Sequence, residues 1–472
     1  MALAQAYAEV QAPVGVALRA MRLEALLGDP RDPANPCGRP VLWASAGACP
    51  EPPQAWDAWS PGGSSAPDEL VRVLRPVFRR DLALGHDWGA RSLTGGPEWE
   101  PEPGPGPVAA LLGPAALVAA AGDVLRMVAR IVDGLGRHES GAGQWRPVLA
   151  AAFGDLLACE SVTTVGLRGA GSFGGTWPPA GSGVPTGTTR DASWSGAGGP
   201  RGGSAPSPGA AMGEPCEGFV PSAGAWAGIW AVVAVVGYVV PVLVGEVLDD
   251  LELVLNECGF GADSPERRTL AKLGADRAVA RVDWAAAASW QARTVCGLGE
   301  LTDPARQRED PGPGSLFRLG EAVSQDGDCH GVLAATLAGA AGRLDGDGDP
   351  VAAALARVAR RLVTEQRALR VACAAHASHD PADPAARALA DRHALLLLAA
   401  AVLGVREAAE NMWVRFLGGP DWALLALGRI TERLGAPLPG RTPDPHPAVW
   451  AELAGRAGNG VDCDLYATKL LW

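Results

Sequence analysis

Apolar residues recur at spacings of three and four along most of this chain, which is the pattern of helices that bury one face. Leu70, Val73, Leu74 and Val77, for example, fall on one side of a helix. The pattern predicts helices over 2–27, 66–83, 107–136, 144–158, 225–258, 264–297, 316–325, 332–343, 350–376, 384–417, 420–435 and 446–457. The expected fold class is therefore mainly α.

One uncharged run, Ala225 to Gly245 (AWAGIWAVVAVVGYVVPVLVG), is long enough to cross a bilayer, which needs roughly 20 apolar residues. Pro241 interrupts the run, no Lys or Arg flanks it closely, and an amphipathic helix pattern continues through Val247 and Leu248. These features favour a helix buried in a bundle over a membrane span. A second apolar block, Ala394 to Val405, is expected to lie centrally in the same bundle.

A composition change divides the chain. Residues 169–218 are rich in Gly, Ser and Pro, and so little apolar surface cannot offset the entropy of ordering, which predicts a loop or disorder. Ser161 to Leu167 (SVTTVGL), just before this stretch, has the composition of a strand. The expected organisation is an N-terminal helical domain (1–159), a reduced or degenerate middle β segment (160–218) and a C-terminal helix bundle (219–472).

The net charge and the spacing of the cysteines restrict which partners and which cellular compartment are expected. The formal net charge of −12, without a basic patch carrying interleaved aromatic residues, argues against a nucleic-acid partner. The nine cysteines are scattered and never form C-x-x-C, which favours free thiols in a reducing compartment. The N-terminus lacks the charged-then-apolar order of a signal peptide, so a cytoplasmic location is expected.

Four local patterns imitate ligand sites, and each is better explained structurally. The DGDGD sequence at 345–349 lacks the Gly and Glu of a calcium loop and predicts a polar turn that caps the next helix. His376 and His379 have no third ligand nearby, which favours a solvated helix end over a metal site. The glycines of 169–174 are not followed by a helix pattern, which a dinucleotide-binding loop requires. The arginines of 357–370 predict a solvated helix face, with a subunit or acidic-ligand contact as the alternative. No metal site is predicted.

Four segments, occurring in the family's order, resemble acyl-CoA dehydrogenases. They are Arg22–Pro36 (RLEALLGDPRDPANP), Asp68–His86, Ala231–Phe260, and Leu389–Leu434 together with Asp464–Thr468 (DLYAT). They are similar, in turn, to the opening helix and turn, a helix of the N-terminal domain, a helix of the C-terminal domain, and the tail of these enzymes. Together they cover less than half of the chain, and no segment alone is decisive.

The resemblance implies a flavoprotein oxidoreductase that uses FAD for the α,β-dehydrogenation of an acyl-CoA thioester. It also implies an electron-transfer partner that reoxidises the flavin, and a homo- or hetero-oligomer. Where the family places its catalytic carboxylate, this chain has Val282-Asp283-Trp284, so Asp283 is the candidate base for removing the α-proton. Glu246 and Glu257 are the next carboxylates to consider, and a helix-surface role is the competing interpretation of Asp283.

The chain departs from the family where flavin and thioester should bind. Low-complexity sequence occupies the place of the family's middle β-barrel domain, Arg137–Gly141 (RHESG) only echoes the family's motif, and no flavin-binding residue can be assigned. Two alternatives therefore stand beside the enzyme. The first is a non-catalytic subunit or scaffold of the same fold, and the second is a protein anchored in a membrane through 225–245.

Overall fold

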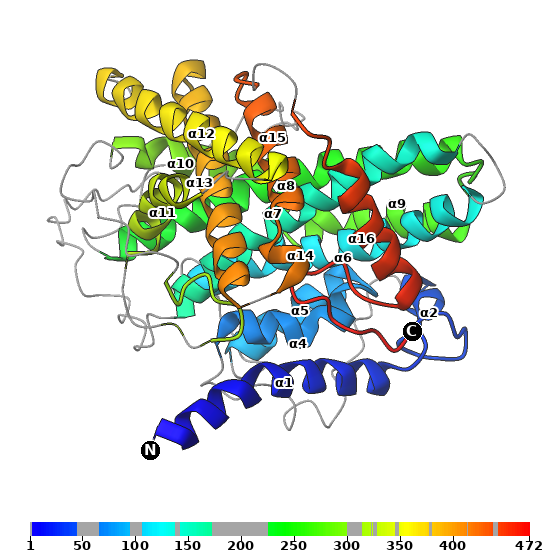
Figure 1. The fold of residues 1–472 in the computed structure, drawn as a ribbon. Coiled ribbons are helices and arrows are strands. Elements are labelled where there is room, and N and C mark those ends of the chain that lie inside the picture. The colour runs from blue at the N-terminus through cyan, green and yellow to red at the C-terminus, as the bar shows by residue number, and fades with distance from the viewer. Residues whose placement is uncertain are drawn as a thin grey trace, which may run out of the picture.

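The computed structural model is helical throughout the part of the chain that it describes (Figure 1). The described residues are 2–44, 66–94, 106–136, 142–171, 225–299, 314–321, 323, 328–344, 349–376, 380–412, 414–437 and 442–472. Within these ranges, β-type pairing is limited to one isolated bridge between Val461 and Lys469. The predicted mainly α class is confirmed.

The described helices occur along the chain in the following order. The first part of the chain forms α1 (Ala2–Leu27), α2 (Arg39–Ala44), α4 (Pro67–Phe78), α5 (Leu82–Thr94), α6 (Pro107–Leu135), the 3-10 turn η1 (Ala142–Trp145) and α7 (Arg146–Gly171). The second part forms α8 (Ala225–Glu257), α9 (Pro265–Val279), α10 (Trp284–Gly297), α11 (Cys329–Arg343), α12 (Pro350–Ala375), α13 (Pro384–Asn411), α14 (Arg415–Gly418), α15 (Pro420–Arg433) and α16 (His446–Asn459).

Four of the predicted helices are corrected by the structure. The ranges 66–83, 264–297 and 384–417 are each split in two, and the described residues of 316–325 form turns instead of a helix. The break inside 264–297 occurs at Arg281, whose φ of 55° is left-handed. No Gly or Pro marks this break in the sequence, because the tertiary structure imposes it.

The predicted strand Ser161–Leu167 is wrong, since these residues lie in the buried helix α7. Buried hydroxyl groups in this stretch are satisfied because they donate to carbonyls one turn earlier in the helix. Ser161 Oγ donates to the Leu157 carbonyl at 2.7 Å, and Thr163 Oγ1 donates to the Cys159 carbonyl at 2.7 Å. Burial on all sides of α7 outweighs the local strand preference.

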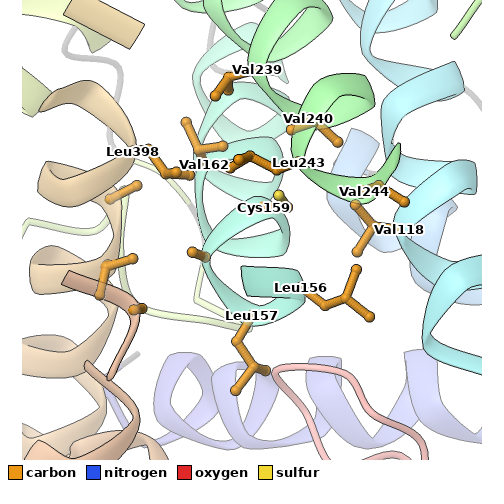
Figure 2. Close-up of a cluster of buried hydrophobic side chains, with 14 of the residues drawn as sticks. Val118, Leu156, Leu157, Cys159, Val162, Val239, Val240, Leu243, Val244 and Leu398 are labelled. Atoms are coloured by element: carbon orange, nitrogen blue, oxygen red, sulfur yellow. The ribbon is translucent and has the colours of Figure 1, made fainter. Parts of the chain in front are cut away.

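The core is centred on α6, α7 and α8, which pack against one another, with α13 beside α7 and α8. Figure 2 shows the junction, where Leu156 and Val162 of α7 lie close to Leu243 and three valines of α8, Val118 of α6 and Leu398 of α13. All of these side chains are almost completely buried. One continuous apolar cluster joins helices from both halves of the chain. The division at 159 and 218 stays a prediction, because much of the middle segment lies outside the described residues.

A proline is accommodated inside α8 because a glycine, which has no side chain, lies where the proline ring needs space. Pro241 cannot donate a backbone hydrogen bond and crowds the carbonyl of the residue four positions earlier, which is Gly237. Gly237 lies against the ring of Trp290 on α10, and a Cβ there would come within 2.6 Å of that ring. The Pro241 carbonyl accepts a hydrogen bond from Arg277 Nη2 at 3.1 Å. α8 therefore remains continuous and packs closely on α10.

The expected cytoplasmic location is wrong. Four stretches among the described residues, 107–135, 143–171, 228–257 and 384–411, are long and apolar enough to cross a membrane by length and composition. Only one of them, 228–257, overlaps the run 225–245 that the sequence singles out as long enough to cross a bilayer. This composition points to membrane association instead, because a bilayer accepts apolar stretches of this length that carry few charges. In the folded chain, between 72% and 94% of each apolar stretch is buried against the rest of the protein.

Candidate functional site

Asp283 is placed at the start of α10, where it acts as the N-cap residue. Its backbone is extended, and its Oδ1 accepts a hydrogen bond from the Ala286 amide at 3.0 Å. An N-cap aspartate in this geometry satisfies an amide that the first helical turn leaves unpaired. The neighbouring Trp284 is 60% exposed. The surroundings of Asp283 are thus those of a helix end at the protein surface.

The two other candidate carboxylates lie on α8, away from Asp283 in the chain. Glu246 Oε2 accepts a hydrogen bond from Arg433 Nη2 at 2.7 Å, and its side chain is 48% exposed. Glu257 is exposed at the last residue of α8. Each of these carboxylates is therefore in contact with solvent, and Glu246 also tethers α8 to α15.

These positions do not fit a flavin and a thioester. Proton abstraction requires a carboxylate within hydrogen-bond reach of the substrate's α-carbon inside a site that excludes water. Asp283 instead uses its carboxylate to cap α10, beside an exposed tryptophan.

The other patterns have structural roles where the structure describes them. Asp349 caps α12 by accepting from the Val351 amide at 2.9 Å, as the polar-turn interpretation predicts, while 345–348 lie outside the described residues. His376 ends α12 and lies 2.9 Å from Asp383 Oδ2. His379 is outside the described part. Among the described residues, no cluster of three or more His, Cys, Asp or Glu side chains suits a metal ion.

Of the cysteines that the structure describes, only Cys296 departs from the expectation of free thiols. Six described cysteines form no disulfide: Cys37, Cys159, Cys258, Cys329, Cys373 and Cys463. Burial raises the pKa of the Cys159, Cys329, Cys373 and Cys463 thiols. Cys296, at the end of α10, is disulfide-bonded. The expectation that all the cysteines are free is therefore wrong at Cys296.

A buried network of charged groups is the largest feature that sequence reasoning missed. Arg75 of α4 donates to Glu160 Oε1 of α7 at 2.6 Å and to Asp462 Oδ2 at 3.0 Å. Arg79 donates to the same Asp462 oxygen at 2.7 Å and to Glu24 Oε1 of α1 at 2.9 Å. The network therefore fastens the C-terminal tail to α1, α4 and α7.

The electrostatics of this network follow from its burial. Burial raises the pKa of Glu160 to about 7, although Arg75 lowers it. For Asp462, burial alone would raise the pKa, but Arg75 and Arg79 lower it below its usual range. Arg75 and Arg79 lie about one helical turn apart, and nothing local in the sequence marks them as buried.

A cavity of about 620 Å³ lies elsewhere, among α2, α6 and the first turn of α9. Arginines dominate its polar lining, and Trp43, Met127 and Ile131 supply an apolar wall. Neither Asp283 nor the carboxylates of Glu246 and Glu257 line it. Its volume is that of a small-molecule site.

No family model, curated protein or solved structure matches this chain. The resemblance to acyl-CoA dehydrogenases therefore rests on the four segments alone.

Proposed function

We propose that this protein is a non-catalytic helical subunit or scaffold whose architecture is similar to that of the helical parts of acyl-CoA dehydrogenases. The observation that carries the proposal is the engagement of the Asp283 carboxylate as the N-cap of α10. A carboxylate that caps a helix is not placed to remove a proton from a substrate. The direct packing of α6 and α7 on α8 supports the same proposal, since it joins the two halves of the chain in one core.

The proposal predicts that Asp283 matters for stability and not for turnover. Asp283→Ala is expected to lower the free energy of unfolding by about 1 kcal/mol, while Asp283→Asn leaves it within a few tenths, because Asn also caps helices. Urea unfolding of both variants measures this, with Asp263→Ala, next to the Ser264 cap of α9, as the matched control. In parallel, the purified protein is expected to show no flavin absorption and no dye reduction with acyl-CoA substrates.

An enzyme would behave differently in the same experiment. Bound flavin with turnover, abolished in Asp283→Asn while the flavin content is unchanged, would establish the dehydrogenase instead. Turnover that survives in Asp283→Asn would move the base to Glu246 or Glu257. Either result would contradict the scaffold.

A second candidate function is favoured by the four apolar stretches: a membrane-associated protein, anchored through 225–245 or one of the other three. If these helices enter a bilayer, the full-length protein stays in the membrane pellet after washing with alkaline carbonate. Replacing Leu243, which faces the core in Figure 2, by Arg is then expected to release protein from the membrane. Recovery of the wild type in the carbonate supernatant would exclude a membrane-spanning anchor.

A further inference from the structure

The cavity among α2, α6 and α9 carries an excess of positive charge in a chain whose net charge is negative. Five arginines line it, against two carboxylates, Asp123 and Glu266; the arginines are Arg31, Arg39, Arg126, Arg130 and Arg268. Such a concentration of guanidinium groups in a hollow attracts anions.

The deepest carboxylate is already shared between two of these arginines. Arg39 and Arg126 each donate to a different oxygen of Asp123. Burial alone would raise the pKa of Asp123, but Arg39 and Arg126 hold it well below its usual range. Burial lowers the pKa of Arg130, and the charge of Arg126 lowers it further. One carboxylate therefore pairs with two cations, the buried Arg126 and the half-buried Arg39, and Arg130 adds a third cation nearby.

Several buried N–H groups around the cavity have no hydrogen-bond partner among the described residues. They are Nε and Nη1 of Arg126, Nε of Arg39 and the indole Nε1 of Trp43. The Arg126 side chain is only 10% exposed. Buried donors of this kind are normally satisfied, so unpaired ones beside a cavity point to an acceptor that is bound there.

The shape of the cavity restricts the ligand further, in addition to the charge of the lining residues. Its apolar wall, formed by Trp43, Met127 and Ile131, lies in the same hollow as the arginines. The first turn of α9, from Pro265 to Thr269, forms another wall and contributes the positive end of a helix of 15 residues. A ligand that fits has an anionic head and an apolar body.

We propose that this cavity binds a small organic anion, with a phosphate or carboxylate group on Arg126 and Arg130 and an apolar part against Trp43. The assignment is independent of the proposed scaffold function, because none of the residues involved belongs to α10. Two kinds of ligand carry such an anionic group, a soluble phosphate ester and an anionic lipid. Both present the same oxygen acceptors to the arginines.

The test uses 1-naphthyl phosphate as the soluble probe and isothermal titration calorimetry on the full chain. Saturable binding is expected, weakened at least about tenfold in Arg126→Gln, since a hydrogen bond to a charged group is lost. Arg268→Gln is expected to weaken binding severalfold. Arg268 is exposed and forms no ion pair within the described residues, so this variant keeps the test valid if Arg126→Gln fails to fold.

Arg267→Gln is the matched control, because Arg267 directly precedes Arg268 in α9 but pairs with Glu252 Oε1 at 2.6 Å, outside the cavity. Its binding is expected to equal that of the wild type. Sedimentation with vesicles containing phosphatidic acid forms the second arm. Vesicle binding that Arg268→Gln weakens identifies a lipid headgroup, whereas binding of the soluble probe alone identifies a phosphate ester. Absence of binding in both arms, or equal losses in Arg267→Gln and Arg268→Gln, would overturn the proposal.

Discussion

Replacing Asp462 by Asn is expected to lower the free energy of unfolding by about 3 to 5 kcal/mol, because it leaves buried arginines without their charge partner. Asp462 Oδ2 accepts from Arg75 Nε at 3.0 Å and from Arg79 Nη1 at 2.7 Å, and its side chain is 0% exposed. Asn keeps the shape and one acceptor but removes the charge. The tail that carries Asp462 should then detach from α4 more readily.

Urea unfolding at neutral pH measures this loss, with Asp444→Asn as the control on an exposed carboxylate of the same region. The pH dependence provides a further check. The folded-state pKa of Asp462 is depressed below 3.8, so its stabilising contribution is present above that pH and is lost as the pH falls through the lower folded value. The gap between wild type and Asp462→Asn should therefore narrow in acid. Equal stability at neutral pH would show that the network does not hold the tail.

The helices were predictable because apolar spacing reports directly which face of a helix is buried. α6, α12 and α16 begin and end within three residues of the predicted bounds. Breaks without Gly or Pro were not predictable, as the left-handed backbone of Arg281 shows, since α9 packs on α5 and α6 whereas α10 packs on α8. The helical state of 161–167 was missed for the same reason: burial decided the outcome against local propensity.

The residues of the candidate site were harder to predict from the sequence than the helices. The sequence placed Asp283 at a helix surface as the competing interpretation, and its capping role agrees with that. Charged residues that pair across the fold cannot be recognised locally, since Arg75 and Asp462 are separated by 387 positions. The arginine-lined cavity was missed too, because α2, α6 and α9 each contribute only part of it. Pairing over such distances is a property of the fold, and single segments look like ordinary solvated helix faces.

Replacing Arg168 by Met is expected to cost about 3 to 5 kcal/mol and to release the turn at 314–321 from α7. The Arg168 side chain is 2% exposed and donates to Asp68 Oδ2 at 2.9 Å. It also donates to the carbonyls of Ser315, Leu316 and Glu321 at 2.7, 2.9 and 2.7 Å. Met fills similar space but leaves the Asp68 charge and three carbonyls without this donor.

The resulting variant should unfold at lower urea and be cleaved by protease near 314–321, where Phe317 anchors the turn against Gly404 of α13. Arg168→Lys keeps the charge but cannot reach four acceptors, so an intermediate loss is expected. Arg360→Met, on the exposed face of α12, is the control. The double variant Asp68→Asn, Arg168→Met should lose less than the sum of the two single losses, because the charge that Arg168→Met leaves unpaired is then absent. Additive losses, with no new cleavage, would mean that Arg168 does not organise the turn and that the packing of Phe317 alone holds it on α13.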